Sequence, residues 1–263
     1  MADPTETPLP TASTPNTPTT LVIDIGGTGL KASVLDRGGA MTTDRVRIPT
    51  TYPCSPEKMV AQLEQLVHPL PPFDRVSVGF PGVVRLGVIL SAPHFVTVHG
   101  PGSPADKKLI AAWDRFDLGA ALTRSLGRPV RIINDADLQG LDVVTGTGVE
   151  VVITLGTGLG FSVFENDRLG PHLELAQHPF RKGDTYNEHI GDAARKKIGN
   201  RRWNKRMRRV IATLDALAFF DHLYIGGGNA RHLTTDKLGP KVSVIDPNAG
   251  ILGGLKLWNT PVR

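Results

Sequence analysis

The 263-residue chain contains a single cysteine, Cys54. It therefore forms no internal disulfide and holds no zinc ion in a cage of its own thiolates. It also lacks any apolar run close to the ~20 residues that a helix needs to cross a bilayer. Its apolar content of 40% is ordinary for a soluble protein. A chain of this length is expected to form one large domain or two lobes.

Residues 1–20 lack both the basic region and the apolar region of a secretory signal. They consist largely of proline, threonine, alanine and acidic residues. Such a segment buries too little apolar surface to offset the entropy lost on ordering. We expect a disordered tail here and a cytoplasmic location for the protein.

Acidic residues are absent between Arg195 and Arg209, whereas basic residues are dense there. The segment contains nine basic residues. Because the whole chain has a net charge of +5, the rest of the chain has a net charge of −4. With no acid at helical spacing to offset the repulsion, the segment is expected to bind a polyanion. The alternative is a solvated helix face. The basic residues are Arg195, Lys196, Lys197, Arg201, Arg202, Lys205, Arg206, Arg208 and Arg209.

Apolar strands and helical patterns alternate along the chain, which predicts the α/β class. Strands are expected at 22–25, 31–35, 46–48, 76–80, 130–133, 149–155, 161–165 and 222–225. Helices are expected at 56–67, where Ser55 is a suitable N-cap, at 109–126, 136–144 and 249–257, and across 186–220.

One unit, an apolar strand followed by a glycine turn and a second strand, occurs twice, at 21–35 and 149–165. This repeat predicts two related lobes that face a cleft. We expect the first lobe at 21–133, joined by the C-terminal segment 249–263, and the second at 134–248. Ligands of open α/β sheets bind beyond the carboxyl ends of strands, where these glycine turns lie.

The first glycine turn combines the residue types of a phosphate and metal site. Gly26 and Gly27 let backbone N–H groups approach an anion closely. Asp24 repels phosphate, but it is able to hold a hydrated Mg²⁺ ion that binds phosphate. Thr28 and Lys31 follow directly. A plain hairpin with a solvent-facing aspartate is the alternative interpretation.

Five motifs follow one another in a fixed order. They are 24–31, Gly79-Phe80-Pro81-Gly82, Asn134-Asp135, Gly156-Thr157-Gly158-Leu159-Gly160 and Gly226-Gly227-Gly228. Together they resemble the ROK family of sugar kinases, in the actin-like ATPase superfamily, over nearly everything after residue 20. The resemblance implies an α/β, two-lobed actin-like ATPase (ribonuclease H-like) fold with a central active-site cleft. It also implies phosphoryl transfer to a hexose.

Within that family the chain is similar to the bacterial polyphosphate glucokinases, because of the basic stretch around Arg202-Trp203-Asn204 and the missing cysteine cluster after the second glycine turn. The similarity implies glucose as acceptor, inorganic polyphosphate, ATP or both as donor, Mg²⁺, and no zinc. An ATP-only kinase of another hexose remains an alternative. A monomer and a homodimer are both open.

The chemistry of the residues, taken together with this resemblance, predicts Asp135 as the catalytic base. A sugar hydroxyl is a poor nucleophile and needs a carboxylate within hydrogen-bond reach to accept its proton. Asn134 offers both a donor and an acceptor to sugar hydroxyls. A helix N-cap is the alternative role for this Asn-Asp pair, because an apolar helical run follows it.

By resemblance, Glu174 and Glu188 accept hydrogen bonds from sugar hydroxyls, and the turn at 79–82 presents backbone groups to the ring. The family places a histidine three residues after the glutamate. Here Gln177 stands at that position and His178 lies one residue further on. Either side chain is a candidate sugar contact, and the altered pattern leaves room for mannose as well as glucose.

Phosphate handling is expected to fall to backbone N–H groups, whose dipoles stabilise the charge of the transition state. Mg²⁺ is expected between Asp24 and the phosphates, through water. The glycines at 226–228 are expected near a nucleotide base or the distal phosphates. The donor-binding candidates are Gly26, Gly27, Thr28, Lys31, Gly156, Thr157, Gly158, Gly226, Gly227 and Gly228.

Three other classes of protein are disfavoured. ROK repressors carry an N-terminal helix-turn-helix, which the 20 Pro/Thr-rich residues do not form. A dinucleotide-dependent oxidoreductase needs Gly-x-Gly-x-x-Gly opening a helix, whereas 156–160 has other spacing and precedes a strand. Nucleic acid is an unlikely partner of the basic segment, because no base-reading module accompanies it.

Overall fold

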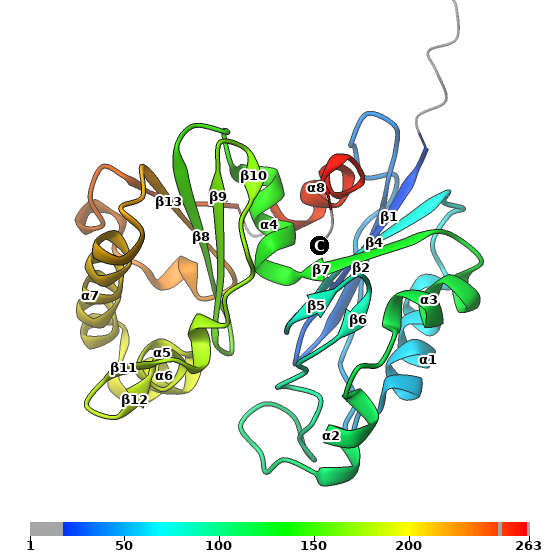
Figure 1. Ribbon diagram of the computed structural model, residues 1–263, viewed down its shortest axis with the longest axis horizontal. Helices are drawn as coiled ribbons and strands as arrows, with labels where there is room; N and C mark the ends of the chain where they lie inside the picture. Colours follow the sequence, from blue (N-terminus) through cyan, green and yellow to red (C-terminus); the bar gives the residue numbers. More distant parts are fainter. Residues whose placement is uncertain (1–17, 247–248, 262–263) are drawn as a thin grey trace, which may run out of the picture.

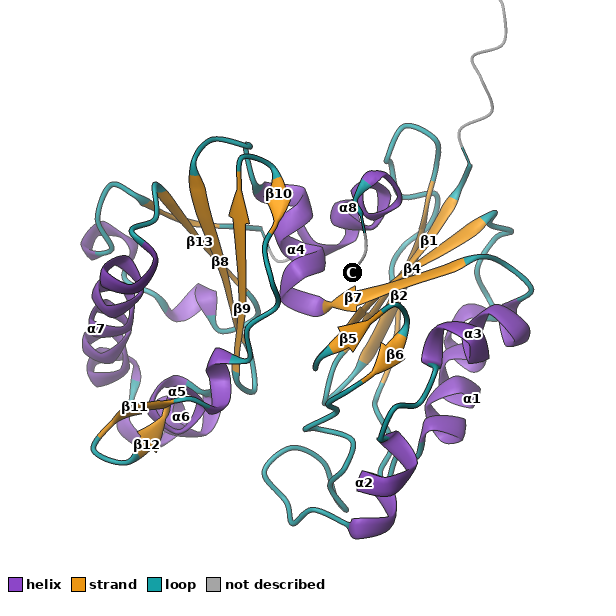
Figure 2. Cartoon of the chain, in the orientation of Figure 1, coloured by secondary structure: helices purple, strands orange, loops and turns teal. Residues whose placement is uncertain are grey.

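The computed structural model describes residues 18–246 and 249–261. They form two lobes, each built on a five-stranded sheet with helices against its faces (Figure 1; Figure 2). The expected α/β class and the two-lobed arrangement are confirmed. The expected disordered tail falls on residues outside the described part, except at its end. There Thr20 already begins the first strand, and the backbone N–H of Thr19 donates to Asp74 at 2.8 Å.

The first lobe has the strand order β3-β2-β1-β4-β7. Strand β1 is antiparallel to β2 and parallel to β4, so the first glycine turn is the β1–β2 hairpin. The strands are β1 (Thr20–Ile25), β2 (Leu30–Leu35), β3 (Val46–Ile48), β4 (Arg75–Phe80) and β7 (Val130–Asn134), with a small hairpin of β5 (Val84–Arg85) and β6 (Val88–Ile89). Its helices are α1 (Pro56–Val67), α2 (Lys107–Trp113) and α3 (Leu118–Leu126).

The single helix expected at 109–126 is wrong, because two helices occupy this region. Helix α2 ends at Trp113, and Asp117 then caps α3 by accepting the N–H of Ala120 at 2.7 Å. Between them Arg115 has a positive φ of 53°, which no continuous helix allows. An aspartate directly before an apolar helical run is the sequence signal of such a cap.

The second lobe has the strand order β10-β9-β8-β13-β14. Gly191 and Gly199 divide the helical region at 186–220 into three helices, and Gly199 has a φ of 76°. The strands are β8 (Val149–Leu155), β9 (Leu159–Glu165), β10 (Arg168–Leu169), β13 (His222–Gly226) and β14 (Val242–Val244), with a hairpin of β11 (Pro179–Arg181) and β12 (Asp184–Thr185). The helices are α4 (Asp135–Val143), α5 (Tyr186–Ile190), α6 (Asp192–Ile198) and α7 (Asn200–Ala218), with 3₁₀ turns η1 (Leu175–Gln177), η2 (Ala230–His232) and η3 (Thr235–Lys237).

Helices α4 and α8 (Ala249–Lys256) lie between the two sheets, whereas α7 covers the outer face of the second sheet (Figure 1). The turn η4 (Leu257–Asn259) follows α8. The hydroxyl of Ser77 on β4 donates to the carbonyl of Gly254 at 2.6 Å, and the indole of Trp258 donates back to Ser77 at 2.9 Å. The C-terminal segment is thus bonded to the centre of the first sheet. Residues 262–263 of the expected segment lie outside the described part.

Three hydrophobic clusters hold the fold together. One fills each lobe between its sheet and its outer helices. The third joins the lobes, because it contains Val22 of β1, Leu138 of α4, Val152 of β8 and Ile251 of α8. In the described part of the chain, no helix has the length and apolar character of a membrane span.

The contact of α4 with α8 depends on glycine. A methyl group built on Gly253 would overlap the carbonyl oxygen of Leu138. We therefore expect Gly253→Ala to push the helices apart and to lower the free energy of unfolding by about 1–3 kcal/mol. The measurement is urea denaturation followed by circular dichroism. Leu252→Ala is the matched control on the same helix, because Leu252 is exposed. Equal effects of the two substitutions would show that the close approach is unimportant.

Candidate active site

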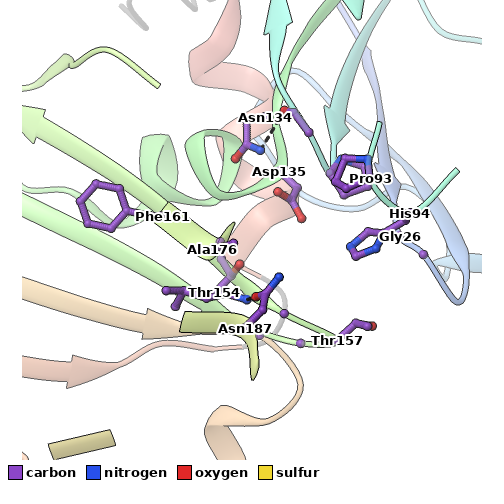
Figure 3. A pocket seen from close by; sticks show the side chains of 18 of the residues that line it. Gly26, Pro93, His94, Asn134, Asp135, Thr154, Thr157, Phe161, Ala176 and Asn187 are labelled. Carbon is purple, nitrogen blue, oxygen red and sulfur yellow. Dashed lines mark hydrogen bonds between the residues drawn. The ribbon is translucent and has the colours of Figure 1, made fainter. Parts of the chain in front are cut away.

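A cavity of about 420 Å³ lies between the lobes and collects most of the residues that the sequence singles out. Both glycine turns line it, the β1–β2 turn from the first lobe and the β8–β9 turn from the second. Figure 3 shows Asp135 projecting into this space, with Gly26 and His94 on one side and Thr157 and Asn187 on the other. The cavity is therefore the candidate active site.

The carbonyl groups of the β1–β2 turn accept hydrogen bonds from two side chains. The hydroxyl of Thr50 donates to the carbonyl of Gly26 at 2.7 Å, and the hydroxyl of Tyr52 donates to that of Gly27 at 2.7 Å. Within the described residues the N–H groups of Gly27 and Thr28 have no protein acceptor. These two donors are thus available to an anion in the cavity.

The β8–β9 turn repeats this arrangement from the opposite lobe. The N–H of Gly156 closes the turn on the carbonyl of Gly158 at 3.0 Å. The N–H groups of Thr157 and Gly158 donate to no acceptor within the described part of the protein. Two turns with two unpaired donors each therefore line one cavity.

The third glycine motif contributes only in part. Gly227 and Gly228 line the cavity. Gly226 does not, because it packs beneath Gln139 and Ile245, where a Cβ would lie 2.8 and 2.9 Å from their side chains. Gly226 is thus a packing residue of β13, and its assignment to donor binding is corrected.

The strand register places three charged residues in a row across the first sheet. Asp24 lies opposite Lys31 on β2, and Lys31 lies opposite Arg47 on β3. The ammonium group of Lys31 forms an ion pair with Asp24 at 2.8 Å, so its charge is already compensated. Arg47 also lines the cavity, its guanidinium lies against Gly29, and no ion pair engages it among the described residues.

Arg47 is therefore the uncompensated cation beside the first glycine turn, a position that the sequence analysis gave to Lys31. Arg47 was not predicted as a site residue, because no sequence motif marks the β3 segment. Only the antiparallel register of β2 and β3 brings Arg47 opposite Lys31.

Asp135 is the first residue of α4, and it lines the cavity. Burial raises the pKa of its carboxyl group, and the negative charge of Asp24 raises it further. The N–H of Ala136 opposes this shift, while the charges of Glu174 and Asp137 add to it, and the pKa reaches about 7. A carboxylate with this pKa is suited to take up a proton near neutral pH.

Asn134 is the N-cap of α4, and Asp135 is not. The side-chain oxygen of Asn134 accepts from the N–H groups of Ala136 and Asp137 at 2.7 and 3.3 Å. Its amide nitrogen donates to the carbonyl of Gly82 at 3.1 Å. The alternative of a helix cap is thus correct for Asn134, and this leaves the Asp135 carboxyl group directed into the cavity (Figure 3).

Only half of the turn at 79–82 reaches the cavity. Pro81 and Gly82 line it. The side chain of Phe80 is fully buried in the first hydrophobic cluster, and Gly79 packs under α4, where a Cβ would lie 3.3 Å from the Cα of Asp135. Gly79 and Phe80 are thus packing positions outside the cavity lining, and of the turn only Pro81 and Gly82 remain candidates for a sugar contact.

The two glutamates that are expected to bind sugar hydroxyls differ in their position relative to the cavity. Glu174 lines the cavity. Glu188 does not, because it closes a capping box at the start of α5 by accepting the N–H of Thr185 at 2.8 Å. Asn187 faces the cavity in its place and accepts the N–H of Leu159 at 2.7 Å. The structure therefore assigns Glu188 a capping role that the Thr-x-x-Glu spacing at 185–188 predicts, and its contact with a sugar hydroxyl stays a prediction.

Gln177 and His178 are placed differently relative to the cavity. Gln177, the last residue of η1, lines the cavity. His178 lies outside the cavity lining, and its ring nitrogen Nδ1 is 3.1 Å from the carbonyl of Pro179. Gln177 is thus the residue available to a sugar.

Two histidines that the sequence analysis did not select also line the cavity. His94 packs against Gly27, and its burial lowers its pKa while the charge of Glu174 opposes that shift. His172 contacts Glu174, with 3.1 Å between Nε2 and the carboxylate. No motif marks either residue in the sequence.

The cavity suits a magnesium ion that arrives with phosphate better than a resident metal. No cluster of three or more histidine, cysteine or acidic residues with metal-binding geometry occurs in the part of the chain that the structure describes. Asp24 uses its Oδ2 atom for Lys31, which leaves Oδ1 for a cation. Magnesium is commonly held by one or two carboxylates, water and substrate phosphates, so Asp24 fits this role.

The basic segment lies on α6 and α7, and none of its nine side chains lines the cavity. The expectation that no acid offsets these charges is wrong, because Asp192 pairs with Arg195 and Lys196 at 2.8 and 2.7 Å. Arg206 donates to the carbonyl of His189 at 2.7 Å. Within the described residues, no hydrogen bond or ion pair engages the side chains of Lys197, Arg201, Arg202, Lys205, Arg208 and Arg209.

Comparison with known proteins identifies the family. The model of the ROK family matches residues 20–171. The polyphosphate glucokinase of Mycobacterium tuberculosis is 29% identical over 218 residues, which cover 80% of this chain and 77% of that protein. The polyphosphate glucokinase of Mycobacterium leprae is 26% identical over 264 residues, covering 95% of this chain and 77% of its own.

Solved structures agree with this result. The inorganic polyphosphate/ATP-glucomannokinase from Arthrobacter sp. strain KM matches with a TM-score of 0.78 and 28% identity, over 92% of this chain and 98% of that one. The ROK family glucokinase from Streptomyces griseus has the same fold, with a TM-score of 0.69 at 18% identity over 91% and 98% of the two chains. Because the family model covers more than half of its length, the chain belongs to the ROK family.

Proposed function

We propose that this chain is a hexose kinase that transfers a phosphoryl group from inorganic polyphosphate or ATP to the 6-hydroxyl of glucose and of mannose. The observation that carries the proposal is the position of Asp135, a carboxyl group with a pKa of about 7 between two glycine turns with unpaired N–H groups. Membership of the ROK family and the similarity to polyphosphate glucokinases support it.

In this proposal Asp135 acts as the general base. Its carboxylate accepts the proton of the sugar 6-hydroxyl as the oxygen forms a bond to the transferred phosphorus atom. The bond between that phosphorus and the donor's bridging oxygen breaks, and the shortened polyphosphate or ADP leaves. The N-cap Asn134 orients this step, because it fixes the first turn of the helix that carries Asp135.

The acceptor sugar is assigned to Glu174, Gln177, Asn187 and the Pro81-Gly82 turn, all of which line the cavity. Glu174 supplies a charged acceptor for sugar hydroxyls, and the two amides supply both donors and acceptors. Amide groups tolerate either orientation of a hydroxyl better than a carboxylate does. This tolerance is our reason to include mannose.

The donor phosphates are assigned to the two glycine turns. The N–H groups of Gly27, Thr28, Thr157 and Gly158 hydrogen-bond the transferred phosphoryl group and its neighbour, and they stabilise the charge of the transition state. Arg47 adds a guanidinium group at the first turn, where planar two-pronged contacts to phosphate are favourable. Magnesium held by Asp24 supplies further charge neutralisation when it is bound with the donor.

Polyphosphate is included as a donor because of the exposed cations of α7. A nucleoside triphosphate is accommodated by the cavity alone, whereas a longer polyanion extends past it. The exposed residues Arg201, Arg202, Lys205 and Arg209 present four unpaired charges on one helix. Their summed field attracts a long polyanion more strongly than a short one.

The direct test is to incubate the purified chain with Mg²⁺, a panel of hexoses and either ATP or polyphosphate. We expect hexose 6-phosphate from glucose and mannose. Asp135→Asn is expected to lower kcat by roughly 10²–10⁴-fold while glucose still binds, because the amide retains the shape but accepts no proton. Calorimetric titration with glucose checks binding. A variant that keeps more than about a tenth of the wild-type kcat would show that Asp135 is not the base.

The same substitution is expected to stabilise the fold. The folded-state pKa of Asp135, about 7, lies above the value near 3.9 of an unfolded aspartate. The unfolded chain therefore loses this proton first, and the site destabilises the fold increasingly as the pH rises from about 4 to 7. Asp135→Asn should raise the Tm more at pH 8 than at pH 4.5. Asp114→Asn, at an exposed position outside the cavity, is the matched control, and an equal pH response in both variants would contradict the assignment.

The role of α7 is tested by replacing Arg201, Arg202, Lys205 and Arg209 together with glutamine. We expect the KM for polyphosphate to rise about tenfold or more and to depend less on salt, because fewer counterions are released on binding. The KM for ATP should change little. Arg206 is left intact because its guanidinium supports the carbonyl of His189.

The matched control removes the same charge from the first lobe, by replacing Lys107, Lys108, Arg115 and Arg124 with glutamine. All four are exposed on or beside α2 and α3. If both quadruple variants raise the polyphosphate KM equally, overall net charge is responsible and α7 has no specific role.

A further inference from the structure

His172 lies between two carboxylates that belong to different elements. Its Nδ1 atom is 3.3 Å from Oδ2 of Asp137 on α4, and its Nε2 atom is 3.1 Å from Oε1 of Glu174, just before η1. The side chains of Asp137 and His172 are 6% and 14% exposed. The Asp137–His172 contact is therefore largely buried, whereas the Glu174 side chain, 33% exposed, lies at the open side of the bridge.

This geometry favours the imidazolium form of His172. A neutral imidazole has one N–H donor, whereas both of its neighbours here are carboxylates, which only accept when ionised. Burial alone lowers the pKa of His172, but the hydrogen bonds and charges of Asp137 and Glu174 outweigh burial and raise the pKa to about 9. Both ring nitrogens then donate, and the positive charge offsets part of the negative charge of the pair.

Glu174 depends on this bridge for its orientation. In the described part of the chain, its carboxylate makes one hydrogen bond, to His172, and its side chain does not cap η1. The Oε2 atom is left for a ligand in the cavity. Asp137 in turn is two residues from Asp135 on the same helix.

We propose that His172 is a positioning residue for the acceptor sugar: its ring ties the carboxylate of Glu174 to the helix that carries Asp135. The inference rests on the proposed function, in which Glu174 binds sugar hydroxyls. The bridge then sets the spacing between the group that holds the sugar and the group that deprotonates it. Other ionisable groups around this end of the cavity are Asp24, His94 and Asp135.

A second cavity, of about 390 Å³, lies on the far side of His172 and is also lined by Asp137. The Oδ1 atom of Asp137 is buried and has no partner within the described residues. The charge of Asp137 is therefore balanced mainly by His172. Removing His172 alone leaves a buried carboxylate unpaired, so a second variant must separate folding from positioning.

The bridge is tested first without any assay of activity. In protein labelled with ¹⁵N-histidine, NMR titration of the full chain should show one histidine that stays charged through pH 8. That signal should be absent in His172→Asn, and its pKa should fall in Glu174→Gln. If His172 instead titrates near 6.5 in the wild-type protein, the bridge does not exist and the inference is wrong.

The positioning role is tested with His172→Asn and with the double variant His172→Asn/Asp137→Asn, which removes the unpaired charge. In both, we expect the KM for glucose to rise about tenfold or more, while the KM for the donor changes less than about twofold. In the wild-type protein, the affinity for glucose should weaken as the pH rises through 9, because the imidazolium is then lost. His68→Asn, at an exposed position at the end of α1, is the matched control.

The two proposals fail in different ways. An unchanged glucose KM in a folded double variant overturns the positioning role while the kinase assignment stands. Equal rises in the KM for glucose and donor also overturn it, because they indicate a general distortion. If the wild-type chain neither binds nor phosphorylates a hexose, the proposed function fails, and the positioning role fails with it even where NMR shows the bridge.

Discussion

The close crossing of α4 and α8 is the contact on which the rest of the structure depends. Gly253 and Gly254 bring α8 against the backbone of α4 and against Val22 of β1, where no larger residue leaves room. Around this crossing a shared hydrophobic cluster joins the two lobes. Because α4 begins at Asp135, the same contact sets the position of the proposed base. The geometry of the candidate active site is therefore decided by backbone packing some distance behind it.

The residues that line the cavity offer two kinds of chemistry, which fit the phosphate donor and the sugar of the proposed reaction. The end nearer the two glycine turns offers unpaired N–H groups and Arg47, which attract phosphate. The lining also contains Glu174 with the His172 bridge, and the amides of Gln177 and Asn187, which suit neutral hydroxyl groups. Asp135 lies between these environments, and its raised pKa reflects burial and the carboxylates around it. The exposed cations of α7 lie outside the cavity.

The sequence was sufficient for features that depend on neighbouring residues along the chain. Glycine turns after apolar strands, and Asn134-Asp135 at the end of β7, are local patterns, and the structure brings them together. Features that depend on competition or tertiary contact were not predictable in this way. Glu188 forms a helix cap, and Asn187 faces the cavity instead. Arg47 lies beside Lys31 only because of the register between β2 and β3. The break between α2 and α3 depends on Asp117, whose side chain caps α3 instead of continuing the first helix.

The hydrogen bonds between Ser77 and the C-terminal segment have a consequence for the synthesis of this protein. Ser77 and Gly254 are 177 positions apart, and the entire second lobe lies between them in the chain. When the first sheet emerges from the ribosome, the surface that α8 will cover is still open to solvent. The first lobe is completed only after the second has been translated. Folding of the two lobes is thus coupled by chain order, and long-range contacts of this kind form slowly.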